Sequence, residues 1–307
     1  FQAPQGAARD AVKFAIHVWY HHFDRAFPYQ NESEIRDALR EKIEEGAVRR
    51  EDLFIVSSVL PPRLWSTFHE RSLVREARQK TPAALRLDCL DLHLMHWPTG
   101  FKGARLLTPR SREELFPADG NGVVVPSDTD FLETWEAMEE LVDAGMVKAI
   151  GVSNHKQVDR LPSKPGLRHK PANNQIESHP YLPQEELMKF CQPKGISVTA
   201  YCPPGAPNWP WSKPQDISLF DDPQIKEIAL KNNKSPAQVL IQLQIQRNLR
   251  LIPKSATPRH IEENFKVRGC LTLAKEEMET FLAFKKRYGI CALREYKNHK
   301  DYPFLED

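Results

Sequence analysis

The feature that most constrains the fold of this chain is a repeated alternation between short apolar or β-branched segments and amphipathic segments of helical period. Such alternation is typical of βα units arranged around a parallel sheet. Seven segments have the composition of buried strands: His21–Arg25, Leu53–Ser58, Leu90–Trp97, Val147–Asn154, Asn174–His179, Ile196–Tyr201 and Leu249–Ser255. Each leads into a predicted helix, so the sequence predicts an α/β architecture with a parallel sheet.

Local signals mark the helix ends. Asn31 and Glu34 form a candidate capping pair at one helix start, and Ser235 and Gln238 form another, with Pro236 in the first turn. Apolar residues at helical spacing mark a central helix: Phe131, Trp135, Met138 and Leu141. Helices are predicted to end at three glycines, each followed within about six residues by a strand: Gly46, Gly145 and Gly195.

Seven strands, each followed by a helix, are one fewer than a (β/α)8 TIM barrel contains. The missing first strand would precede Phe1, because the first residues predict a helix from Ala7 to Ile16. A doubly wound sheet is the alternative, but no strand leads into the GxGxxG turn that such sheets use for dinucleotides. The two longest irregular segments, Pro98–Asp128 and Pro203–Asp221, follow strands directly, where a barrel places its active-site loops. We predict one barrel domain over residues 1–307.

Charge and cysteine content narrow the possible partners and compartment. Lys and Arg total 43 against 41 Asp and Glu, without a long basic run, which argues against a nucleic-acid partner. The five cysteines are scattered and lack a CxxC pair, which favours a reducing compartment over a disulfide framework. No apolar run approaches the roughly 18 residues of a membrane helix. We therefore expect a cytoplasmic protein that acts on small molecules, with no membrane or obligate protein partner.

Titratable side chains occur at the predicted strand ends, where a barrel keeps its catalytic groups. They are Asp24, Tyr29, His96, Glu177, Tyr201 and Lys254. A metal site is disfavoured, because His93 and His96 are three residues apart in a strand and point to opposite faces. A serine nucleophile is disfavoured too, because Ser153 lies in no GxSxG turn. The remaining chemistry for these side chains is proton donation by a tyrosine or a histidine.

A phosphate site is indicated between Ile252 and Pro258. A strand there ends in Lys254 and Ser255, and a helix starts at Thr257 with a proline in its first position. Free backbone N–H groups at a helix start attract phosphate, and a lysine with two hydroxyls adds to that attraction. The alternative is an ordinary capped helix beside a solvated lysine.

Eight segments, in this order, match one protein family: FDRAFPYQNE (Phe23–Glu32), REDLFIVS (Arg50–Ser57), LDLHLMHWPTGFK (Leu90–Lys102), VKAIGVSN (Val147–Asn154), NQIESHPYL (Asn174–Leu182), VTAYCP (Val198–Pro203), IPKSATP (Ile252–Pro258) and HKDYPF (His299–Phe304). Over nearly its whole length the chain resembles the aldo-keto reductases, and within them the aldose reductase-like group. The resemblance implies a (β/α)8 barrel whose N-terminal hairpin and first strand would precede Phe1. It also implies a monomer that uses NADPH to reduce aldehydes or ketones to alcohols by hydride transfer.

The resemblance implies a role for individual residues. Tyr29 would donate the proton, Asp24 would support it, and His96 would orient the carbonyl group. Cofactor contacts are implied for Ser153, Asn154 and Gln175 on the carboxamide, Tyr201 under the nicotinamide ring, Lys254, Ser255 and Thr257 on the 2′-phosphate, and Glu263 and Asn264 on the adenine. An apolar pocket for hydrophobic or aromatic carbonyl compounds would be lined by Trp97, Trp211, Cys291 and Leu293.

The chain departs from the family pattern at the lysine that tunes the tyrosine. Ser58 holds that position, an inserted Val59–Pro62 follows, and Arg63 precedes the Leu-Trp pair where the family has lysine. Without a cation, Asp24 is a partly buried carboxylate that destabilises the fold or becomes protonated. His260 also replaces a family arginine near the 2′-phosphate. Two alternatives remain open: a pseudoenzyme that binds NADP(H), and a degenerate fragment with little turnover.

Overall fold

A sheet of seven parallel strands forms the centre of the molecule, in the order β1-β2-β5-β6-β7-β8-β9. The computed structural model of the protein describes residues 4, 6–26, 29, 31–57, 59–60, 64–65, 89–100, 125–126, 128–154, 156–205, 217–267, 269–284, 286–291, 299–300 and 302–303. The strands are β1 (His22–Arg25), β2 (Phe54–Ser57), β5 (Leu92–Met95), β6 (Ile150–Ser153), β7 (Asn173–Glu177), β8 (Ser197–Tyr201) and β9 (Arg250–Leu251). Each predicted strand is thus confirmed.

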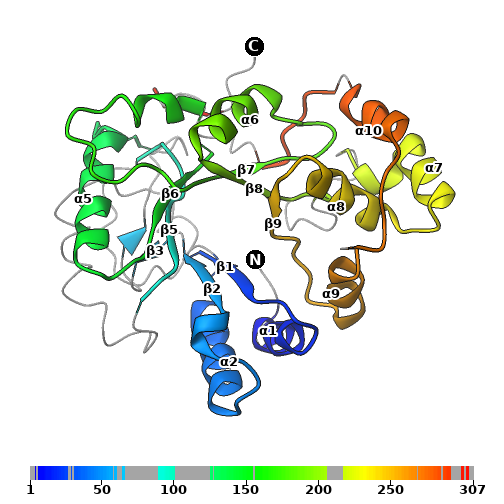
Figure 1. The fold of residues 1–307 in the computed structure, drawn as a ribbon, viewed down its shortest axis with the longest axis horizontal. Coiled ribbons are helices and arrows are strands. Elements are labelled where there is room, and N and C mark those ends of the chain that lie inside the picture. Colours follow the sequence, from blue (N-terminus) through cyan, green and yellow to red (C-terminus); the bar gives the residue numbers. More distant parts are fainter. Residues whose placement is uncertain are drawn as a thin grey trace.

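The sheet curls into an incomplete barrel with the helices on its outside (Figure 1). In the described part of the chain, β1 and β9 are the two edges of this sheet, as expected for a (β/α)8 barrel with one strand fewer. The helices are α1 (Ala7–His17), α2 (Glu32–Glu44), α5 (Phe131–Asp143), α6 (Glu185–Cys191), α7 (Pro223–Lys231), α8 (Pro236–Gln246), α9 (Pro258–Phe265) and α10 (Lys275–Leu282). No helix in the described ranges is both long and apolar enough to cross a membrane.

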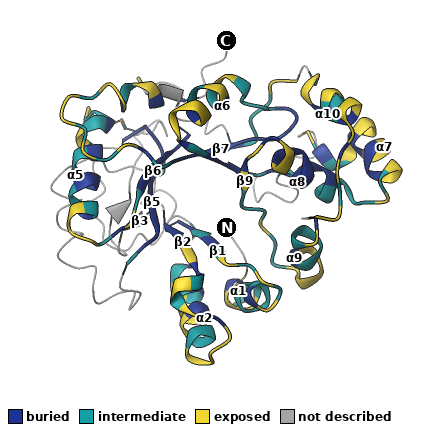
Figure 2. Cartoon of the chain, in the orientation of Figure 1, coloured by how far each residue is buried: buried dark blue, intermediate teal, exposed yellow. Residues whose placement is uncertain are grey.

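Hydrophobic packing between the sheet and the helices forms the core. The strands are largely buried, whereas the helices turn exposed faces outward (Figure 2). The predicted stripe on α5 is buried at each position: Phe131, Trp135, Met138 and Leu141. The capping box between Ser235 and Gln238 begins α8 as predicted. Gly145 follows α5 with φ 69°, a left-handed conformation that favours glycine and ends the helix.

Helix α1 connects the two ends of the open barrel. It packs between α2 and α9 (Figure 1). Directly after α1, the Tyr20 hydroxyl donates to the Ile261 carbonyl in α9 at 3.3 Å. The Tyr20 ring also packs against Phe265, with ring centroids 4.8 Å apart. The helices that flank β1 and β9 are therefore in contact, although the two strands are not paired.

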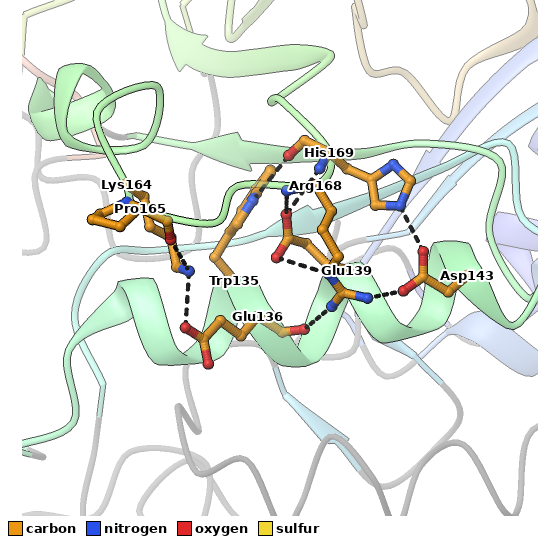
Figure 3. Close-up of polar contacts among 8 residues, drawn as sticks. All are labelled: Trp135, Glu136, Glu139, Asp143, Lys164, Pro165, Arg168 and His169. Atoms are coloured by element: carbon orange, nitrogen blue, oxygen red, sulfur yellow. Dashed lines mark hydrogen bonds and ion pairs between the residues drawn. The ribbon is translucent and has the colours of Figure 1, made fainter.

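A buried carboxylate attaches α5 to the segment that leads into β7 (Figure 3). Glu139, 1% exposed, accepts backbone N–H bonds from Arg168 and His169 at 2.7 and 2.8 Å. The Trp135 indole donates to the His169 carbonyl at 3.1 Å, and Asp143 binds both the Arg168 and His169 side chains. These contacts fix the loop that joins β6 to β7. Both strands carry predicted site residues toward their carboxyl ends.

Two local predictions differ from the structure, and one segment for which none was made forms a strand pair. The Asn31 side chain makes no cap at the start of α2, and Glu34 instead accepts the Gly6 backbone N–H at 3.0 Å, because the turn before α1 lies beside it. Strand β9 ends at Leu251, so Lys254 lies beyond the strand in a loop. The first two residues of the insertion after Ser58 form β3 (Val59–Leu60), which pairs antiparallel with β4 (Leu64–Trp65) outside the parallel sheet.

Candidate functional site

The carboxyl ends of the strands bring five predicted site residues into one hydrogen-bonded network. Gln175 in β7 donates from Nε2 to Asp24 Oδ1 in β1 at 3.1 Å. Ser153, the last residue of β6, donates from Oγ to the Gln175 carbonyl at 2.9 Å. Tyr201, the last residue of β8, donates from its hydroxyl to Asn154 Oδ1 at 2.8 Å. Parallel strands place their carboxyl ends at one edge, which explains why residues distant in sequence meet here.

Asn154 is the centre of this network. Its φ of 60° is left-handed, a conformation that asparagine tolerates better than most residues. The turn lets its backbone N–H donate to the Gln175 carbonyl at 2.9 Å. Its Nδ2 lies 3.1 Å from Ser153 Oγ and 3.3 Å from the His96 carbonyl. Asn154 therefore joins the ends of β5, β6, β7 and β8.

Asp24 lies in this network without a described ion pair. Burial raises its pKa from 3.8 to about 7, and the Gln175 hydrogen bond and the Arg25 charge oppose that rise. Within the described ranges, Arg25 instead forms an ion pair with Glu32, with an N–O distance of 3.8 Å. The sequence predicted that an unpartnered Asp24 would become protonated, and the direction of the pKa shift agrees with that prediction. Ser58 and Arg63, the two positions considered for a cation, lie outside the described residues.

Tyr29 and His96 are electrically neutral at pH 7 for the same physical reason. Burial lowers the pKa of His96 to about 4. Burial raises the pKa of Tyr29 above its ordinary value, and electrostatic interactions with Asp24, Cys202 and Cys291 raise it further. The Tyr29 phenol, which lies close to Asp24, therefore stays protonated. The His96 imidazole is in its neutral form and carries one ring proton, not two.

The predicted phosphate residues lie in the loop after β9 and at the start of α9. Thr257 is the N-cap of α9 and Pro258 its first residue, as predicted. Ser255 Oγ accepts the Thr257 N–H at 3.1 Å, and Lys254 is exposed. Glu263 is bonded to Arg259, at 2.7 Å, and Asn264 lies beside it on α9, half-buried. The described chain shows no ion pair for Lys254, whose charge therefore faces solvent.

The predicted pocket walls are only partly described. Trp97 is buried and stacks on the His96 ring, with centroids 5.8 Å apart. Cys291 is also buried, near Tyr29 and Tyr201. Trp211 and Leu293 lie outside the described residues. Among residues that the structure places, no group of three or more His, Cys, Asp or Glu could hold a metal ion.

Glu177 has a role that the sequence did not reveal. This buried carboxylate at the end of β7 accepts backbone N–H bonds from Ile290 and Cys291 at 2.6 and 2.9 Å. It also accepts a hydrogen bond from His179 Nε2 at 2.8 Å. The C-terminal segment that carries Cys291 is thereby held against the strand ends. The sequence marked Glu177 only as a titratable strand-end residue, because its backbone partners Ile290 and Cys291 are more than a hundred residues away.

Replacing Glu177 with glutamine is expected to destabilise the protein by about 1–3 kcal/mol. The amide keeps the size of the side chain but turns one acceptor into a donor that faces another buried N–H. Urea denaturation measures the loss. Glu186→Gln is the matched control, because Glu186 is 89% exposed and pairs with the exposed Lys189, so its change should stay within about 0.5 kcal/mol. Equal stability of both variants would contradict the role of Glu177.

Comparison with known proteins identifies the family. A sequence model described as the Aldo/keto reductase family matches residues 2–285. Over 300 residues the chain is 39% identical to "Aldo-keto reductase family 1 member D1" of Mus musculus, covering 97% of this chain and 88% of that protein. It is 41% identical over 316 residues to "Aldo-keto reductase family 1 member A1" of Gallus gallus, covering 99% and 92%.

The fold agrees with the sequence match. The solved structure of the aldose reductase from Schistosoma japonicum superposes with a TM-score of 0.85 at 38% identity, over 99% of this chain and 93% of that one. The curled parallel sheet, its outer helices and the polar strand ends thus belong to a known enzyme fold. The chain is a member of the aldo/keto reductase family of oxidoreductases.

Proposed function

We propose that this chain is an NADPH-dependent reductase that converts aldehydes or ketones to alcohols, with residues 1–307 as one barrel domain. The observation that carries the proposal is the hydrogen-bonded network from Asp24 through Gln175 and Asn154 to Tyr201. It lies at the strand ends where barrels place catalysis, in a chain of a carbonyl-reducing family. We further propose that it works as a cytoplasmic monomer and needs no partner other than its small-molecule substrate.

The chemistry of the described residues fits NADPH at both ends of the cofactor. Ser153, Asn154 and Gln175 offer hydroxyl and amide groups for the carboxamide, and Tyr201 offers an aromatic face for the ring. Lys254 offers an exposed cation at the start of α9, whose free N–H groups favour a phosphate. Glu263 and Asn264 are adjacent on α9 and suit a purine edge. When bound, NADPH supplies the hydride.

Of Tyr29 and His96, Tyr29 is the better candidate for the proton donor. With a pKa of about 4, His96 is neutral at pH 7, so it can orient a carbonyl oxygen by hydrogen bonding but is not a proton source. The raised pKa of Tyr29 keeps the phenol protonated. A protonated phenol serves reduction, whereas the reverse reaction would need the phenolate. The buried Trp97 beside His96 favours apolar or aromatic carbonyl substrates.

Cofactor binding tests the proposal directly, with Lys254→Ala as the informative variant. Fluorescence titration should show NADPH binding to the native chain, and the variant should bind NADPH roughly tenfold more weakly, since it lacks a charged contact to phosphate. NADH affinity should change little, because NADH lacks the 2′-phosphate. Lys275→Ala is the control, because Lys275 is 85% exposed on α10. Equal losses for both cofactors would contradict the assignment of Lys254.

A second function, binding of NADP(H) without turnover, is favoured by one observation. Asp24 has no ion pair among the residues that the structure describes, and its pKa is raised instead of lowered. A site without a cation tunes the Tyr29 phenol less well. Titration combined with NADPH oxidation in the presence of an aromatic aldehyde separates the two functions: binding with turnover supports the reductase, and binding alone supports the pseudoenzyme.

A further inference from the structure

Two cysteines from distant parts of the chain meet beside the site. Cys202 follows β8 directly, and Cys291 lies 89 residues later in the C-terminal segment. Their sulfur atoms are 3.8 Å apart, and both residues are free thiols. All five cysteines lie in the described part of the chain, and this is the one pair within hydrogen-bond distance.

The backbones of both cysteines are fixed by hydrogen bonds. Cys202 occupies a left-handed turn, with φ 49°, in which its carbonyl accepts the Gly205 N–H at 2.9 Å. The Cys291 N–H donates to the buried Glu177 carboxylate at 2.9 Å. The two sulfurs are thus held near each other, and a disulfide requires their distance to fall from 3.8 Å to about 2.0 Å.

We propose that Cys202 and Cys291 are an oxidant-sensitive dithiol that forms a reversible disulfide within one chain when it reacts with hydrogen peroxide. Cys202 is the half-buried member and so meets the oxidant first. Its thiolate attacks one peroxide oxygen and breaks the O–O bond, which leaves a sulfenic acid on Cys202 and, with one proton taken up, releases water. The sulfur of Cys291 then displaces the sulfenic hydroxyl, and its own proton leaves with that hydroxyl as a second water. Two thiols lose two electrons and two protons, and the peroxide gains them.

The environment of Cys291 suits the second step. The thiol is buried, and the Cys202 hydrogen bond together with burial raises its pKa well above the ordinary value. It therefore stays a protected thiol until the adjacent sulfenic acid forms. Disulfides of this transient kind are the ones expected in a reducing compartment.

The disulfide would tie the turn after β8 to the C-terminal segment. Both sulfurs lie close enough to Tyr29 and Tyr201 to influence the pKa of each phenol. The bridge would therefore fix one wall of the site. Its effect on turnover rests on the proposed function, but its formation does not, so the two can fail separately.

Peptide mapping of the full chain tests the proposal. The reduced protein is exposed to hydrogen peroxide, its remaining thiols are blocked with N-ethylmaleimide in denaturant so that the buried cysteines also react, and it is digested without reductant. We expect a cross-linked peptide that contains Cys202 and Cys291 and lacks two hydrogen atoms, with blockable thiols falling from five to three in a monomeric chain. Dithiothreitol should restore all five.

Two variants sharpen the test. Cys270→Ser removes the exposed cysteine and should leave the cross-link unchanged, whereas Cys202→Ser should abolish it and leave Cys291 available to the blocking reagent. The proposal is overturned if the native chain oxidises each cysteine separately to a sulfinic or sulfonic acid. It is equally overturned if both stay blockable, or if the cross-link joins two chains through Cys270.

Discussion

Replacing Tyr29 with phenylalanine is expected to lower NADPH-dependent reduction of an aromatic aldehyde by at least about a hundredfold, the usual contribution of a positioned general acid. The variant lacks only the phenolic hydroxyl. His96 cannot take over, because its pKa of about 4 leaves it neutral at working pH. The rate of NADPH oxidation, followed by absorbance, measures the loss. NADPH affinity should be unchanged, because Tyr29 is not assigned to the cofactor.

Tyr20→Phe is the matched control for that experiment. Tyr20 also carries a phenol with a raised pKa, about 12, but its hydroxyl bonds to Ile261 at the contact between α1 and α9. Its removal should leave turnover intact. If Tyr29→Phe keeps the native rate, another group supplies the proton and the assignment of Tyr29 is wrong.

The second large effect concerns stability, which Asp24→Asn is expected to increase near pH 8. Asparagine keeps the Oδ1 acceptor for Gln175 and removes the buried charge. The pKa of Asp24 rises from 3.8 to about 7 on folding, so between these values the folded chain binds more protons than the unfolded chain. Stability therefore falls as pH rises through this window, by up to about 4 kcal/mol. Below the window the variant should resemble the native chain.

Urea denaturation near pH 5 and pH 8 measures this linkage. Asp52→Asn is the control, because the pKa of Asp52 is lowered by Arg49 and its removal should cost a little stability. If Asp24→Asn instead loses stability near pH 8, a cation pairs with Asp24 in the native protein. That cation would then take the place of the family lysine that tunes the tyrosine. The expected gain would instead mark Asp24 as a residue that lowers stability at a functional site.

Much of the fold is readable from local sequence, because local signals act within a turn or a strand. The β-branched runs predict each strand, Ser235 and Gln238 predict the start of α8, and Gly145 follows the end of α5. Local signals fail where a distant segment competes. Glu34 binds Gly6 from another helix start instead of capping its own, which no pattern near residue 34 could indicate.

The candidate site likewise has residues that the sequence predicted and a contact that it could not predict. The resemblance supplied Gln175, Asn154 and Tyr201, and the structure shows that they form one network with Asp24. The link between Cys202 and Cys291 could not be predicted, because neither residue lies in a local pattern and 89 residues separate them. Only the curling of the sheet and the return of the C-terminal segment bring these residues together.

The central claim is that this chain transfers hydride from NADPH to a carbonyl carbon. It is tested most directly with NADPH that carries deuterium in place of its C4 hydrogens, an aromatic aldehyde and the native chain, followed by mass spectrometry of the alcohol. The account predicts an alcohol with one deuterium on the carbinol carbon, absent from the Tyr29→Phe reaction over the same time. An alcohol without deuterium, or bound NADPH with no alcohol formed, would contradict it.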